Sequence, residues 1–255
     1  MKRIPVVAGN WKMNTLRSDA VELARAIRER SDGVTGVEKI VCPPFVFLHD
    51  VRAALEGSTI KLGSQNVYWE EKGAFTGEVS VTQIAEVAQY AIIGHSERRQ
   101  YFGETDDTVN RRVKSALAHG LKPIMCVGET LEQRQGGETK DVLVRQTRGG
   151  LEGVDAGSEF IIAYEPVWAI GTGLAADGAM AEEAIGLIRA TVREIAGAVA
   201  EQVRILYGGS VTGDNVAEFM AQPDIDGGLV GGASLKADGF AAIIQGTAAA
   251  VTARA

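Results

Sequence analysis

Phe160-Ile161-Ile162-Ala163-Tyr164-Glu165 is a short stretch in which apolar residues follow one another without alternation and a carboxylate comes last. A strand covered on both faces has this pattern, because neither of its two sets of side chains meets water. Ile4-Pro5-Val6-Val7-Ala8 repeats it near the start of the chain. The two stretches therefore predict a parallel sheet with its faces covered by helices.

Eight such runs alternate with helical patterns along the chain. Their starts lie about 32 residues apart, which matches a strand–helix–strand unit. Between them Val21, Ala24 and Ile27 recur at helical spacing, and Ser80 with Gln83 gives a capping-box signature. The predicted strands are residues 4–9, 38–42, 60–64, 90–94, 122–127, 160–165, 203–208 and 226–231.

Eight units in succession predict an α/β fold, a (β/α)8 TIM barrel of eight parallel strands ringed by helices. A doubly wound open sheet is the alternative that periodicity alone leaves open. No run resembles a linker, and the 31 glycines gather in short clusters such as Gly208-Gly209. We therefore expect residues 1–255 to form a single TIM-barrel domain with many tight turns.

Composition excludes several classes of function. The net charge of −7, from 26 Lys and Arg against 33 Asp and Glu, argues against nucleic-acid and anionic-membrane partners. No apolar run approaches the roughly 20 residues that span a bilayer, and nothing near the start marks export. Cys42 and Cys126 are most simply core thiols. These features predict a soluble cytoplasmic protein.

Polar residues and glycines follow particular predicted strands. In a barrel of this kind the active site lies at the carboxyl ends of the strands. The residues found there are Asn10 and Lys12 after the first strand, His95 and Glu97 after the fourth, Glu165 at the end of the sixth, Ser210 after the seventh, and Gly231 with Gly232 after the eighth. One base, one cation and one imidazole therefore converge with two glycine-rich turns.

Five motifs along residues 4 to about 240 resemble those of the triosephosphate isomerase family. They are GNWKMN at 9–14, GHSERR at 94–99, AYEPVWAIGTG at 163–173, YGGSV at 207–211 and GLVGGASL at 228–235. The resemblance implies an isomerase without cofactor or metal that interconverts glyceraldehyde 3-phosphate and dihydroxyacetone phosphate. The reaction is a proton transfer through an enediolate, in glycolysis and gluconeogenesis.

The resemblance assigns Glu165 and His95 to the chemistry. Glu165 matches the family's catalytic base, which must lie close to a weakly acidic carbon proton in a dry pocket. His95 matches the group that donates a hydrogen bond to the enediolate oxygen. This family is itself the standard example of an imidazole pKa lowered by a helix N-terminus, and the resemblance implies the same here. Ser96 is expected to cap a short helix that begins at Glu97.

Lys12 matches the family's substrate-binding lysine. Some such cation is needed, because a phosphate dianion and an enediolate must be held by a protein of net charge −7. Asn10 offers an amide to the same oxygen. Glu97 either assists proton transfer, or holds Lys12 or caps the helix. The other histidines, His49 and His119, fall in helical contexts and are interpreted as solvated or capping.

Ser210, Gly231 and Gly232 resemble the family's phosphate-binding turns. Gly171 would supply a further N–H from a lid over residues 166–176, which excludes water and suppresses loss of phosphate. The family often has Gly-Lys-Thr-Ala after the lid tip, whereas this chain continues Leu174-Ala175-Ala176-Asp177-Gly178. This departure from Leu174 to Gly178 affects the hinge but no proposed catalytic group.

The loop from Gln65 to Glu78 resembles one that inserts into a neighbouring subunit, which implies a homodimer. The alternative is a self-packed surface loop. Tyr68, Trp69 and Phe75 are expected to be buried in one of these two ways.

Two other functions stay open. One is another phosphate-binding barrel isomerase, which would hold a different acid/base pair, and the other is a catalytically silent barrel kept for binding or adhesion. The combination of Lys12, His95 and Glu165 favours the triose phosphate reaction.

Overall fold

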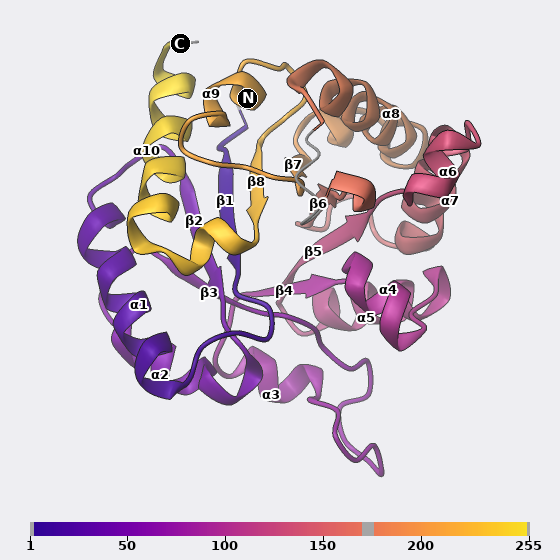
Figure 1. The fold of residues 1–255 in the computed structure, drawn as a ribbon. Helices are drawn as coiled ribbons and strands as arrows, with labels where there is room; N and C mark the ends of the chain where they lie inside the picture. Colours follow the sequence, from indigo (N-terminus) through magenta and orange to yellow (C-terminus); the bar gives the residue numbers. More distant parts are fainter. Residues whose placement is uncertain (1–2, 170–175, 254–255) are drawn as a thin grey trace.

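The computed structural model describes residues 3–169 and 176–253. Within them eight parallel strands form one closed barrel, and helices surround it (Figure 1). The strands are β1 Val6–Asn10, β2 Glu38–Cys42, β3 Lys61–Ser64, β4 Tyr90–Ile93, β5 Lys122–Val127, β6 Ile161–Tyr164, β7 Arg204–Tyr207 and β8 Gly227–Val230.

The α-helices lie in the segments that follow the strands. They are α1 Arg17–Ser31, α2 Leu48–Ala54, α3 Val81–Ala85, α4 Ser96–Phe102, α5 Asp106–Ala118, α6 Leu131–Gln135, α7 Thr139–Leu151, α8 Gly178–Ala196, α9 Val216–Met220 and α10 Ala237–Ala253. Short 3-10 helices are η1 Phe45–Phe47, η2 Val167–Ala169, η3 Gly197–Glu201 and η4 Gly232–Leu235. Among the described residues no helix is long and apolar enough to cross a membrane.

All eight predicted strands are confirmed. The bounds of β2 and β5 are those predicted, and the other strands differ by one or two residues at their ends. The predicted capping box is also present, because the Ser80 hydroxyl accepts from the Gln83 N–H and the Gln83 amide oxygen accepts from the Ser80 N–H. Local pattern therefore locates the elements well.

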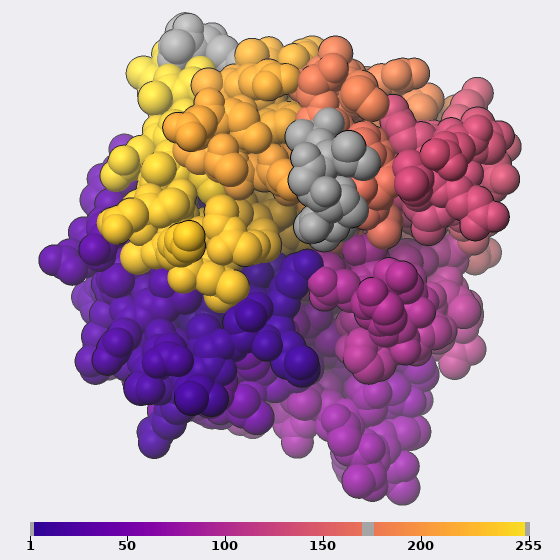
Figure 2. Space-filling view, viewed as in Figure 1, coloured from indigo at the N-terminus to yellow at the C-terminus, as the bar shows by residue number. Residues whose placement is uncertain are grey.

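The barrel closes where β1 pairs with β8 as well as with β2. Val6 lies opposite Gly227 in the first pairing and opposite Glu38 in the second. Gly227 has a φ of 134°, and a Cβ there would lie 1.8 Å from the Val6 carbonyl oxygen, so only glycine fits. Figure 2 shows the indigo start of the chain meeting its yellow end. The closed ring excludes the open doubly wound sheet.

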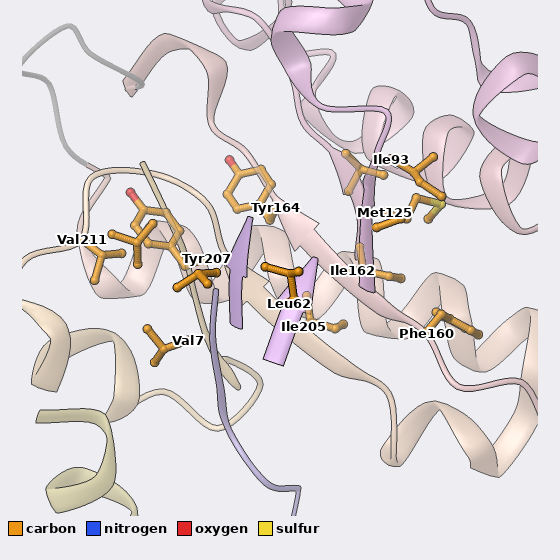
Figure 3. Packing of buried hydrophobic residues seen from close by; sticks show 14 of the residues in the cluster. Val7, Leu62, Ile93, Met125, Phe160, Ile162, Tyr164, Ile205, Tyr207 and Val211 are labelled. Carbon is orange, nitrogen blue, oxygen red and sulfur yellow. The ribbon is translucent and has the colours of Figure 1, made fainter. Parts of the chain in front are cut away.

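The apolar core has two layers that follow the alternation of the strands. Val7, Ile93, Met125, Ile162 and Ile205 belong to the layer between strands and helices (Figure 3). Their neighbours in sequence form a second cluster, which includes Val6, Ala8, Ile92, Ile124, Ala163 and Leu206 together with both free cysteines, Cys42 and Cys126. The cysteines are therefore core thiols, as predicted.

The same alternation places two polar residues at the mouth of the barrel. Asn10 lies two residues beyond Ala8 on β1, and Glu165 lies two residues beyond Ala163, just after β6. Because side chains two apart on a strand share a face, both point to the inner side at the carboxyl ends. The fold therefore brings an amide and a carboxylate together from distant parts of the sequence.

A charged network ties the opposite ends of the strands together. Glu38 accepts from the Tyr90 hydroxyl and from the Arg204 guanidinium. Arg204 also lies 2.9 Å from Glu159, which lies 2.8 Å from the Lys122 ammonium. Burial raises the pKa of Tyr90, so this phenol stays protonated and donates. These contacts fix the amino ends of β2, β4, β5 and β7.

Candidate active site

A cavity of about 500 Å³ opens at the carboxyl ends of the strands. This volume suits a small molecule. The predicted residues in its wall are Asn10, Lys12, His95, Glu165, Ser210, Gly231 and Gly232. They lie at the carboxyl ends of five different strands, so the closed barrel is what brings them together.

The Glu165 carboxylate is buried, with 2% of the residue exposed, and is held by two donors. One oxygen lies 2.9 Å from His95 Nε2, and the other accepts from the Ser96 N–H at 2.8 Å. Burial by itself raises the pKa of Glu165, but His95 and the Ser96 N–H hold that pKa below its ordinary value. The carboxylate is therefore ionised at neutral pH.

His95 is the N-cap of α4, and the helix begins at Ser96. The prediction that Ser96 caps a helix beginning at Glu97 is therefore wrong by one residue. His95 Nδ1 accepts from the Glu97 N–H at 3.2 Å. A ring nitrogen that accepts carries no proton, so we assign the proton of a neutral imidazole to Nε2, which faces Glu165.

The pKa of His95 does not follow the lowering expected at a helix N-terminus. Burial lowers it, but the carboxylates of Glu165 and Glu97 together raise it by more, so the pKa of His95 lies above its ordinary value. Of the two carboxylates, Glu165 has the larger effect on the pKa of the imidazole.

Lys12 is held in an uncommon backbone conformation. Its φ is 52°, a left-handed value that a residue with a side chain rarely adopts. Its N–H donates to the Asn10 side-chain oxygen at 3.0 Å, and the Gln65 amide donates to its carbonyl at 2.8 Å. Lys12 Nζ lies 2.5 Å from a Glu97 oxygen. Asn10 and Gln65 therefore hold the backbone of Lys12, and Glu97 holds its ammonium group at the site.

Glycines make room for the turns on the far side of the cavity. A Cβ at Gly209 would lie 2.2 Å from the Tyr207 hydroxyl, and one at Gly208 would lie 3.0 Å from Glu165 Cγ. At Gly232 nothing lies within 4 Å of the Cβ position. The turn after β7 therefore requires glycine for packing, whereas Gly232 leaves open space.

Comparison with known proteins identifies the family. A family model described as triosephosphate isomerase matches residues 5–247. The chain belongs to the triosephosphate isomerase family. The triosephosphate isomerases of Acetivibrio thermocellus, Citrifermentans bemidjiense and a Dehalococcoides mccartyi strain are 54%, 53% and 51% identical to it. The matches cover 96%, 95% and 94% of this chain and 99%, 98% and 95% of those proteins.

Membership of the triosephosphate isomerase family confirms the resemblance that the five motifs indicate. Glu97 is absent from the cavity wall and contacts it through Lys12 and His95. The predicted N–H donor Gly171 lies outside the described residues, as do positions 174 and 175 of the hinge departure. Asp177 caps α8 through the Met180 N–H, and the Gly178 N–H donates to Glu218 at 2.6 Å.

The motifs of the triosephosphate isomerase family did not single out Glu129, a buried residue beside the site. One of its carboxylate oxygens accepts from the Tyr164 hydroxyl at 3.1 Å and from Trp168 Nε1 at 2.9 Å, and lies 3.2 Å from Arg134. Glu129 thereby joins the end of β6 and η2 to α6. A lone Glu in a loop gives no periodic signal, so only the fold reveals it.

Proposed function

We propose that this chain interconverts glyceraldehyde 3-phosphate and dihydroxyacetone phosphate, as a triosephosphate isomerase. The observation that carries the proposal is the buried, ionised Glu165 in contact with His95 Nε2, in a cavity that also contains Lys12. A carboxylate, a neutral hydrogen-bond donor and a cation are what enolisation beside a carbonyl requires.

Glu165 is the base in this proposal. It takes the proton from the carbon beside the carbonyl and returns it to the neighbouring carbon, so that carbonyl and hydroxyl exchange places. To reach a substrate carbon the carboxylate must turn away from the Ser96 N–H and His95. Losing these donors in a buried pocket raises the pKa of the carboxylate, which makes it a stronger base.

His95 donates a hydrogen bond from Nε2 to the carbonyl oxygen. As carbonyl and hydroxyl exchange places, Nε2 passes its proton to this oxygen and takes the proton of the neighbouring hydroxyl oxygen, so the imidazole ends the reaction neutral. Once Glu165 turns towards substrate, the larger of the two negative charges that raise the His95 pKa moves away, and Glu97 remains. Burial and the Glu97 N–H on Nδ1 remain, and both oppose an imidazolium. The neutral imidazole is therefore the donor to the developing enediolate.

Lys12 and Asn10 bind the negatively charged substrate, and Ser210, Gly231 and Gly232 surround its phosphate. Glu97 holds Lys12 in this account, because its carboxylate lies 2.5 Å from Lys12 Nζ and 3.6 Å from His95 Nδ1. A salt bridge at the shorter distance favours the holding role over proton transfer.

We infer a cytoplasmic homodimer, each chain one barrel domain over residues 1–255, that works in glycolysis and gluconeogenesis. The loop from Gln65 to Glu78 projects from the barrel between β3 and α3 (Figure 1). Phe75 in this loop is 40% exposed, and Met13 and Val46 on nearby connections at the carboxyl ends of β1 and β2 are more exposed still. Exposed apolar side chains of this size are typical of an interface.

A coupled assay of glyceraldehyde 3-phosphate conversion tests the proposed function, with chelator-treated protein and no nucleotide added to the isomerase. We expect rapid turnover, and incorporation of deuterium into dihydroxyacetone phosphate incubated with the protein in D₂O. A folded protein that produces neither turnover nor exchange would count for the silent barrel instead.

A further inference from the structure

Arg99 lies on α4, but its side chain turns back to the ends of two strands. Its Nε donates to the Gly94 carbonyl at 2.9 Å, and its Nη2 donates to the Cys126 carbonyl at 3.4 Å. Gly94 directly follows β4, and Cys126 lies near the end of the neighbouring strand β5. One guanidinium group therefore spans the carboxyl ends of β4 and β5, next to the site.

The Gly94 carbonyl belongs to the peptide that leads into His95. Among the described residues no backbone N–H donates to this carbonyl outside regular elements, so Arg99 is its donor. Gly94 has a φ of 70°, and a Cβ there would lie 2.7 Å from Val109, so glycine is required. Because glycine leaves the backbone free to rotate, the orientation of this peptide depends on the Arg99 hydrogen bond.

Asp106 fixes the Arg99 guanidinium from the side of α5. One Asp106 oxygen lies 2.7 Å from Arg99 Nη1, and the other lies 2.9 Å from Arg145. The Arg99 side chain is 16% exposed and the Arg145 side chain 60%. The two arginines thus share one carboxylate, but Arg145 has no hydrogen bond to a strand-end carbonyl in the described structure.

We propose that Arg99 is a positioning residue for the isomerase reaction. Arg99 fixes the orientation of the Gly94–His95 peptide, and thereby the direction of the imidazole that faces Glu165. It also holds the end of β5 against the end of β4. This inference rests on the proposed function, because it takes His95 and Glu165 as the groups that act on substrate. Lys12 and the glycine turns follow other strands, so the loss of Arg99 acts on turnover rather than on substrate binding.

Steady-state kinetics of Arg99→Ala and of the matched control Arg145→Ala test the inference. A misplacement of about 1 Å can reduce a rate about a hundredfold. We expect Arg99→Ala to lose about tenfold to about a hundredfold in kcat, with KM and the inhibition constant of inorganic phosphate within about threefold of wild type. Arg145→Ala should retain both constants.

Rescue by guanidinium ion separates positioning from a general loss of structure. A cavity of about 920 Å³ is bounded by Gly94, Arg99, Asp106 and Glu165, so the space left by the Arg99 side chain is open to a small cation. Added guanidinium should restore part of the kcat of Arg99→Ala and leave Arg145→Ala unchanged.

Arg99→Lys is the variant that tests the inference if Arg99→Ala does not fold. It keeps a cation beside Asp106 but cannot span both carbonyls, so we expect reduced kcat at a near-native melting temperature. Full kcat in both Arg99 variants, an equal loss in Arg145→Ala, or a loss confined to KM would overturn the inference. An inactive wild-type protein would count against the proposed function instead.

Discussion

At Glu165 burial and hydrogen bonding act on the carboxylate in opposite directions. Burial raises the pKa of Glu165, whereas His95 and the Ser96 N–H together lower it by more. The folded pKa therefore lies below the ordinary 4.5. The carboxylate in turn raises the pKa of His95 above its ordinary 6.5. Two residues that are 70 positions apart in the sequence therefore set each other's charge.

This coupling predicts how stability depends on pH. A carboxylate with a lowered pKa stabilises the fold above its unfolded pKa, and this contribution is lost as pH falls through the folded value. A histidine with a raised pKa stabilises the fold below its unfolded pKa, and this contribution is lost as pH rises through the folded value. The stability difference between wild type and Glu165→Gln should therefore be greatest between pH 4.5 and pH 6.5.

Urea unfolding of both proteins from about pH 3 to about pH 9 measures this difference. We expect the stability difference to become smaller below pH 4.5 and above pH 6.5. A difference that does not change with pH would show that Glu165 and His95 are not coupled in the folded protein.

At the scale of elements, Glu129 joins β6, η2 and α6, which are separate segments of the sequence. Tyr164→Phe removes one hydroxyl donor to this buried carboxylate and changes little else. A hydrogen bond to a charged group contributes about 1.5–3 kcal/mol, so the free energy of unfolding should fall by that amount. Tyr101→Phe on α4 is the matched control, because Tyr101 is exposed and its loss should cost less than about 0.5 kcal/mol. Equal urea midpoints for the two variants would contradict the role of Glu129.

Local pattern predicted the elements better than their ends. The predicted runs 38–42 and 122–127 are strands with the predicted bounds, and their apolar residues lie in both layers of the core. The sequence places the N-cap of α4 one residue too late, because the Ser96 hydroxyl predicts a cap that the imidazole of His95 provides instead. Tyr68 and Trp69 stack on each other at 4.2 Å, and Trp69 packs under the Arg112 guanidinium of α5, so both rings are half-buried within one chain.

The residues around the site divide in the same way. Lys12, His95 and Glu165 lie just after strand ends, and this position allows the sequence alone to predict them as site residues. Gln65, Arg99 and Glu129 act through backbone carbonyls or through other side chains, which no sequence spacing encodes. Their roles required the closed barrel.

At the scale of the whole molecule, the projecting loop makes assembly testable. Phe75→Glu places a charge on an exposed apolar ring, and burying that charge in an interface would be costly. We expect this variant to sediment as a monomer under conditions in which the wild type is a dimer. Ile195→Glu on α8, an exposed apolar residue away from the loop, should leave the dimer intact. A dimeric Phe75→Glu protein would argue for the self-packed loop.

In the proposed reaction the Glu165 carboxylate moves the proton from one carbon to the other. Turnover of Glu165→Gln tests it most directly, because the amide keeps the size and the buried position but cannot accept the proton. We predict a loss in kcat of at least about a hundredfold, the lower range for general base catalysis, with inhibition by inorganic phosphate largely retained. Near-native turnover by this variant would contradict the account.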